Sequence, residues 1–160
     1  MRTTKSSKYK VAKMPVIITP EKIKEITQEL DCGMKCFYHI ATGEIESYPH
    51  ELKGHAGFEE EFWQDTIKKV KKNYKLYIAF EGMESHESFR LLETFIGNIE
   101  DGKTRSYFEE AICLKKPFQQ FKVCLHEYDG LEQQWYQFKN EQLIKWVELQ
   151  LAGYNSAHTL

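Results

Sequence analysis

Long apolar runs are missing from this sequence. No stretch approaches the roughly 18–20 consecutive apolar residues that a membrane-spanning helix needs, so we predict neither a membrane span nor a membrane partner. The first fourteen residues are basic and lack the apolar core of a secretion signal. Only four cysteines occur, and in a chain without such a signal we expect reduced thiols. These absences predict a soluble cytoplasmic protein.

An excess of charge of one sign is also missing. The 22 basic and 24 acidic residues leave a formal net charge of −2, which argues against attraction of the whole surface to nucleic acid or anionic lipid. A local basic patch is still compatible with these numbers. The sequence contains no glycine-rich phosphate loop, no His-Glu-x-x-His helix and no Ser-His-Asp order, so it matches no standard catalytic template. No cofactor is predicted, and the missing templates favour a non-enzymatic protein.

What the chain does contain is material for a core. Hydrophobic residues make up 41% of the 160 residues and aromatic residues 14%, enough for one domain without disulfides or metal. The sequence predicts three segments: a flexible basic lead-in at residues 1–14, a single α+β domain at residues 15–153, and a frayed tail at residues 154–160.

Alternation of apolar residues along residues 36–48, interrupted by Thr42-Gly43, predicts a β-hairpin. A two-residue loop at Thr42-Gly43 would place His39 opposite Glu46. A neighbouring carboxylate poises an imidazole for general acid–base chemistry, which makes His39 and Glu46 the candidate catalytic residues. The alternative, which we favour, is an ordinary cross-strand charge pair.

Helical periodicity dominates the rest of the chain. The predicted helices begin at Thr19-Pro20, near Trp63, at Ser85, at Asp101, at Pro117 and at Leu131, with Gly153 as the last stop signal. A third strand is predicted at residues 76–80. The order is therefore α-ββ-α-β-α-α-α-α. We predict an α+β fold, in which a small antiparallel sheet, made of the β-hairpin and the third strand, packs with a helical C-terminal half.

Two blocks of the C-terminal half repeat one pattern, an aromatic pair at i and i+3 followed by lysine: Phe118 to Lys122 and Trp135 to Lys139. Such a block can be a surface that stacks bases and holds phosphates. It can also be a buried helix face along which lysine stems extend, which we favour. The residues expected to share one core are Phe89, Leu92, Ile96, Phe108, Ile112, Phe118, Phe121, Leu125, Trp135, Phe138 and Trp146.

Lysines supply the candidate binding surface. These candidates are Lys68, Lys69, Lys71, Lys72, Lys115, Lys116, Lys122 and Lys139. The first group runs from Lys68 to Lys72 and the second from Lys115 to Lys122. If the two groups share one face, they form a positive strip that binds polyanions with steep salt dependence. The alternative is a solvated helix face, with the first group offset by Glu59, Glu60 and Glu61.

The spacing of the cysteines gives only weak support for a zinc site. Cys32-x-x-x-Cys36 falls within the loose range for one ligand pair, but Cys113 and Cys124 are too far apart for a second pair. Cys113 and Cys124 also lie on predicted apolar helix faces, as small buried hydrophobic residues do. No metal site is predicted.

Four blocks resemble a known bacterial family, Uncharacterised Protein Family 0158. They are Glu81 to Ser85, Lys115 to Lys122, Trp135 to Lys139, and the hairpin from Tyr38 to Ile45. Many members carry Gly-x-Gly-Ala-Phe where this chain has Leu114 to Phe118, and the Lys-Lys-Pro-Phe form is similar to a Bacteroidetes-type branch. The resemblance implies no established activity.

The leading functional hypothesis is a small non-enzymatic interaction module whose partner is nucleic acid or another protein. One alternative is an enzyme acting on a nucleic-acid or phosphorylated substrate, with His39 and Glu46 at its site. Another is a zinc-stabilised adaptor. A cleft with perturbed titratable groups would favour the enzyme, and an exposed patch would favour the module.

Overall fold

The computed structural model describes residues 14–51 and 57–159, so the predicted lead-in at residues 1–14 lies outside them except for Met14. Contacts divide the chain into two compact units. The sheet unit comprises the described residues up to Gly82 together with those from Trp146 onward, and the helical unit comprises Met83–Lys145. The prediction of a single domain over residues 15–153 stays a prediction.

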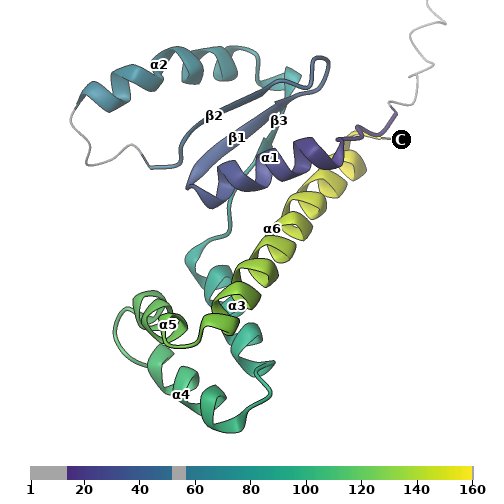
Figure 1. The fold of residues 1–160 in the computed structure, drawn as a ribbon. Coiled ribbons are helices and arrows are strands. Elements are labelled where there is room, and N and C mark those ends of the chain that lie inside the picture. Colours follow the sequence, from purple (N-terminus) through teal and green to yellow (C-terminus); the bar gives the residue numbers. More distant parts are fainter. Residues whose placement is uncertain (1–13, 52–56, 160) are drawn as a thin grey trace, which may run out of the picture. The chain divides into compact units, whose positions relative to one another are not determined.

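The sheet unit holds three strands and two α-helices ahead of the helical unit (Figure 1). Its elements are α1 Pro20–Asp31, β1 Met34–His39, β2 Ile45–Pro49, α2 Gly57–Lys72, the 3-10 turn η2 Tyr74–Leu76, and β3 Tyr77–Phe80. The sheet is antiparallel throughout, in the order β2-β1-β3. The predicted hairpin with a third strand is confirmed.

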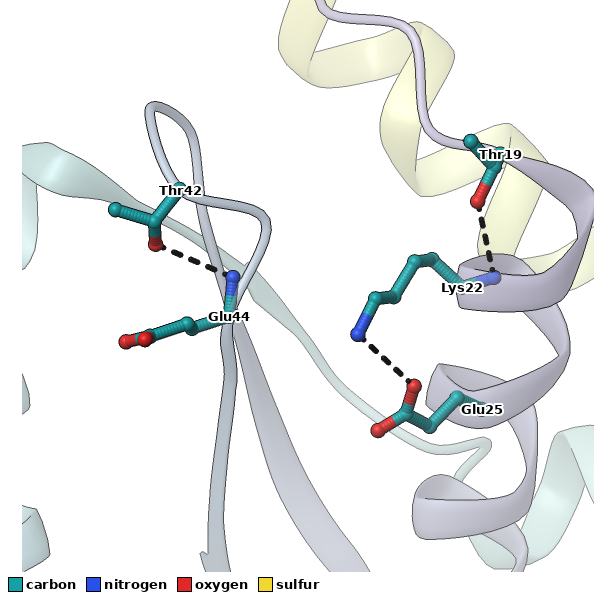
Figure 2. A network of polar contacts seen from close by, with 5 residues as sticks. All are labelled: Thr19, Lys22, Glu25, Thr42 and Glu44. Carbon is teal, nitrogen blue, oxygen red and sulfur yellow. Dashed lines mark hydrogen bonds and ion pairs between the residues drawn. The ribbon is translucent and has the colours of Figure 1, made fainter.

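The first helix begins and ends on the residues that the sequence indicates. The Thr19 hydroxyl accepts a hydrogen bond from the backbone N–H of Lys22 at 3.3 Å, and Pro20 occupies the first turn. Lys22 Nζ in turn contacts Glu25 Oε2 at 3.2 Å (Figure 2). Gly33 follows the helix with a φ of +82°, the left-handed geometry that suits glycine.

The two helices cover opposite faces of the sheet. Ser47 of β2 donates a hydrogen bond to Glu29 of α1 at 2.8 Å, whereas its neighbour Glu46 accepts one from Lys69 of α2 at 2.6 Å. Because successive strand residues point to opposite faces, α1 and α2 must lie on opposite sides, as Figure 1 also shows. Cys36, fully buried, faces α1.

The hairpin turns where expected, but its register differs from the prediction. Phe37, not His39, lies opposite Glu46, and the pairing continues to His39 and Glu44 around a loop at residues 40–43. The His39 ring nitrogen Nδ1 accepts hydrogen bonds from the backbone N–H groups of Ala41 and Thr42 at 3.2 and 3.1 Å. These bonds satisfy the amide groups of a loop wider than two residues, so the predicted two-residue loop is wrong.

Thr42 and Gly43 still carry the turn. The Thr42 hydroxyl accepts from the N–H of Glu44 at 3.2 Å (Figure 2), and Gly43 adopts a φ of +75°. Gly43 lies outside both strands, as predicted.

The C-terminal half is helical, which confirms the α+β class. Its elements are α3 Ser85–Gly97, α4 Gly102–Ile112, α5 Pro117–His126 and α6 Asp129–His158. The first of these is capped at Glu84 without a side-chain hydrogen bond, so the predicted cap at Ser85 is wrong by one residue. Among the described residues no helix is both long enough and apolar enough to cross a membrane.

The core of the helical unit contains most of the predicted aromatic and aliphatic residues. Its buried members are Leu92, Phe95, Ile96, Ile99, Phe108, Ala111, Phe121, Cys124, Leu125 and Trp135, and Phe89, Ile112 and Phe138 pack against them partly buried. Phe118 is 38% exposed and contacts only the rim of this core, through Phe89 at 6.3 Å between ring centroids. Trp146 belongs to the sheet unit, so its predicted place in this core is wrong.

The last helix continues past Gly153, where a stop was predicted. Asn155 explains the continuation: its side chain donates to the carbonyl of Val16 at 3.0 Å and accepts from the N–H of Val16 at 2.8 Å. Gln150 makes the same two-way contact with the backbone of Glu81, at 2.9 and 3.0 Å. These tertiary bonds hold residues 154–158 in the helix although the sequence predicts a frayed tail there.

Candidate binding surfaces

The lysines of α2 divide into one that is paired and three that are not. Lys69 Nζ lies 2.6 Å from Glu46, and this hydrogen bond raises the pKa of Lys69. Lys68, Lys71 and Lys72 are exposed and, at i, i+3 and i+4, share one side of the helix. Within the described part of the chain these three have no carboxylate partner, so they are available to a ligand. Of the three acids expected to offset them, Glu61 is exposed on the same helix, and the side chains of Glu59 and Glu60 lie outside that part.

A feature that the sequence reading missed follows directly after these lysines. Tyr74 is 65% exposed on η2, and Lys75 Nζ lies 5.9 Å from the centre of its ring. The signal was present, because tyrosine next to lysine at a helix end is visible in the sequence. The exposure of Tyr74 could not be predicted, because this residue also fits the apolar stripe of the preceding helix.

Three of the candidate lysines in the helical unit lie on α5 or directly before it. Lys115, Lys116 and Lys122 are exposed, as are the apolar residues Leu114 at 58% and Val123 at 55%. We group these residues with the half-exposed Phe118 under the name of the α5 surface, in which Phe118 and Lys122, at i and i+4, share one side of the helix and Val123 lies further round it. The α5 surface is defined by Leu114, Lys115, Lys116, Phe118, Lys122 and Val123.

Lys139 and Lys116 differ from the other candidate lysines. Lys139 is half-buried and already engaged in an interaction, so it does not belong to this surface. Lys116 has a φ of +57°, an uncommon conformation for a residue with a side chain. Glycine would adopt this conformation more easily.

The repeated aromatic blocks are mainly core. Phe121 and Trp135 are 1% and 8% exposed, and their rings pack at 4.8 Å between centroids. Phe138 is partly buried against the same cluster. The interpretation as buried helix faces is therefore confirmed for these three residues, and Phe118 alone of the four reaches the surface.

The candidate catalytic residues are not brought together as a pair. His39 packs its ring edge-on against Tyr77 at 5.0 Å and uses Nδ1 to hold the turn. Glu46 is bound to Lys69. Each side chain thus has a structural partner of its own, and the directly opposed placement predicted for the two is wrong, because Phe37 lies opposite Glu46.

A comparison with protein families now adds to this geometry. The model of the Uncharacterised protein family (UPF0158) matches residues 56–155. The chain belongs to this family. The family resemblance is confirmed over this range, which contains both lysine groups but neither His39 nor Glu46. The hairpin block from Tyr38 to Ile45 lies outside the matched range, and the Bacteroidetes-type branch stays a prediction.

One curated relative of this UPF0158 chain is the UPF0158 protein PA5073 of Pseudomonas aeruginosa. It is 30% identical over 70 residues, which are 44% of this chain and 46% of the relative. The matched part thus spans about half the length of that relative. No solved structure matches the chain.

The cysteines of this UPF0158 protein divide by burial. Cys36 is fully buried, and burial, aided by the nearby Glu29 carboxylate, raises the pKa of its thiol to about 12. Burial also raises the pKa of Cys124. Cys32 and Cys113 are exposed. All four are free thiols, and the buried pair is protected from reaction.

Metal-ligating atoms converge at one place among residues 14–51 and 57–159. Glu84, His86 and Glu87, at the start of α3, bring one potential ligand atom each within 4.8 Å of the others. His86 contacts Glu84 at 3.4 Å and Glu87 at 3.5 Å, which accounts for the cluster as contacts between neighbouring side chains. No cysteine takes part, so this geometry does not support the zinc adaptor.

The resolved pKa shifts in this UPF0158 chain all lead away from neutrality. A hydrogen bond to Glu127, at 3.0 Å, raises the pKa of Tyr107 to about 12. Hydrogen bonds from Thr104 lower the pKa of Asp101. General acids and bases need pKa values near the working pH, and none of these shifts provides one.

Proposed function

We propose that this protein is a small cytoplasmic binding module without catalytic activity, and that its α5 surface binds an acidic segment of a protein partner. The observation that carries the proposal is the exposure of Leu114, Phe118 and Val123 among lysines that have no acidic partner within the described residues. The separate partners of His39 and Glu46 and the direction of the pKa shifts favour binding over catalysis.

The composition of the α5 surface suits a protein better than a nucleic acid. Leu114 and Val123 are aliphatic, so they offer no flat ring on which a base could stack. They can bury apolar side chains at the centre of an interface, while Phe118 supplies an aromatic anchor. Lysines around such a centre attract acidic residues and speed association more than they add to affinity.

A site-specific cross-link tests the proposal on the full chain in its native cell. Phe118 is replaced by benzoylphenylalanine, and Leu149, 66% exposed in the sheet unit, carries the same group in a control chain. We expect a discrete protein product at position 118 that is absent at position 149. Mass spectrometry should locate the cross-link in a partner segment that contains Asp or Glu beside apolar residues.

Charge reversal makes the test specific. The variant K115E/K116E/K122E should abolish the cross-linked product, whereas K24E/K103E/K145E, with the same change in net charge at other exposed lysines, should leave it intact. Equal loss in both variants, or a nucleic-acid product at position 118, would refute the assignment of this surface to an acidic protein.

A further inference from the structure

We infer that the C-terminal end of α2 is a second binding surface, for single-stranded nucleic acid, with Tyr74 as the stacking ring and the neighbouring lysines as phosphate contacts. This surface belongs to the sheet unit and goes beyond the proposed function, which concerns the helical unit. We call it the α2 surface, and it is defined by Lys68, Lys71, Lys72, Tyr74 and Lys75.

The charges on this surface are not neutralised by neighbouring acids. Glu46, on the sheet face that α2 covers, is engaged by Lys69 at 2.6 Å. Among the described residues, no carboxylate forms an ion pair with Lys68, Lys71 or Lys72. Lysines at a helix C-terminus also interact favourably with the helix dipole, which is reason enough for some of them to be there. The interaction with the dipole does not explain why an exposed aromatic ring, Tyr74, lies beside these lysines.

The ring of Tyr74 is exposed, and the backbone that carries it is held on both sides. The N–H and the side-chain amide of Asn73 donate to the carbonyl of Lys69 at 3.2 and 3.0 Å, which fixes the segment to the end of α2. The carbonyl of Leu76 accepts from the N–H of Ile40 at 2.9 Å, which fixes it to the hairpin loop. A backbone anchored on both sides presents the ring to a base without a loop having to become ordered first.

Lys75 completes the arrangement. Its Nζ lies 5.9 Å from the centre of the Tyr74 ring, within the range of a cation–π contact. Because the Lys75 ammonium group lies over one face of the ring, a base would stack on the other face, with this positive charge close enough to bind the phosphate of the same nucleotide. Stacking requires an unpaired base, and for this reason we assign the surface to single strands and not to duplexes.

Fluorescence anisotropy with labelled twelve-nucleotide oligo(U) and oligo(dT), on the purified full chain, tests the inference. We expect binding at 20 mM KCl that weakens steeply up to 150 mM, with a logarithmic salt slope of about −2 to −3 for three or four phosphate contacts. A duplex of the same length should bind less tightly. No binding at 20 mM KCl would overturn the inference.

Matched variants locate the binding. K68Q/K71Q/K72Q leaves only the Lys75 contact, so the salt slope should fall to about −0.7, and K24Q/K103Q/K145Q, with the same loss of charge, should keep the original slope. Y74A should weaken binding about tenfold, and Y74F, which retains the ring, should bind like the unmodified chain. Unfolding midpoints confirm that the variants are folded.

Two further results would also overturn the inference. One is an equal loss of binding in both lysine triples. The other is displacement of the oligonucleotide by poly-glutamate at an equal concentration of charge, which would mean that the surface binds acidic chains in general. Because this assay contains no protein partner, its failure leaves the cross-linking result at Phe118 unaffected.

Discussion

Burial separates the four cysteines into two classes with different reactivity. Cys36 and Cys124 are 0% and 3% exposed with raised pKa values, whereas Cys32 and Cys113 are exposed. Because the thiolate is the reactive form, we expect two thiols to react with Ellman's reagent at pH 8 in the folded chain and four after denaturation without reductant. C32S/C113S should lower the folded count to zero. One zinc per chain by elemental analysis would contradict this account.

Thr19 is a second residue whose effect can be isolated. Its hydroxyl is the side-chain cap of α1, so Thr19→Ala should lower the free energy of unfolding by about 1 kcal/mol. Thr19→Ser keeps the acceptor and should cost only a small fraction of this. Urea denaturation measures both. An alanine variant as stable as the serine variant would show that the cap contributes nothing.

Asp101, the cap of α4, links stability to pH. Hydrogen bonds from the Thr104 hydroxyl and then the Thr104 N–H hold its pKa below the usual 3.8. A lowered folded-state pKa gives stability that is present above about pH 4 and lost as the pH falls through the folded value. The stability gap between the unmodified chain and Asp101→Ala should therefore close between pH 6 and pH 2. Thr104→Val should reduce the pH-dependent part of this stability difference. A difference that does not change with pH would contradict the role of Asp101 as a pH-dependent cap.

At the scale of elements, α5 shows how one helix serves both core and surface. Phe121 is 1% exposed and packs against the rings of Phe95, Phe108 and Trp135, so Phe121→Ala should cost about 3–5 kcal/mol. Val123 on the opposite side is 55% exposed, and Val123→Ala should change stability by less than about 0.5 kcal/mol. Chemical denaturation distinguishes the two. A fully stable Phe121→Ala chain would show that Phe121 is not needed in the core and would make it a candidate stacking residue again.

The order and type of the elements were predictable because apolar periodicity and turn residues are local signals. What the sequence could not supply depends on hydrogen bonds of single side chains, some of them to partners far along the chain. The hairpin register follows from hydrogen bonds to His39 Nδ1, and the extension of α6 past Gly153 follows from the contact between Asn155 and Val16. Lys69 differs from its neighbouring lysines only through Glu46, 23 residues away.

The candidate sites were predictable to the same limited degree. Charge is visible in the sequence, so most of the lysines were correctly expected at the surface. The exposure of Tyr74 and Leu114 was not visible, because apolar residues at helical spacing usually point inward. The binding roles of both surfaces stay predictions until the experiments above are done.

At the scale of the whole molecule, α6 is the element that the two units have in common. This helix runs without interruption from Asp129 to His158, yet its residues up to Lys145 belong to the helical unit and those from Trp146 to the sheet unit. Trp146 and Gln150 bind the backbone of Glu81, which leaves β3 just before the helical unit begins. The sheet unit is therefore assembled from two separate parts of the chain.

A shared helix predicts that the chain unfolds as one cooperative domain, as expected for residues 15–153. Loss of either unit removes the packing of part of α6, and short helices are marginal without tertiary contacts. Tryptophan fluorescence can follow each unit separately, because W63F/W146F leaves only Trp135 in the helical unit, and W135F leaves only the two tryptophans of the sheet unit. Within each background, Phe121→Ala should lower the urea midpoint by the same amount, since a two-state transition has one midpoint for all probes. If Phe121→Ala shifts the Trp135 signal alone, the two units unfold independently and the single-domain prediction is wrong.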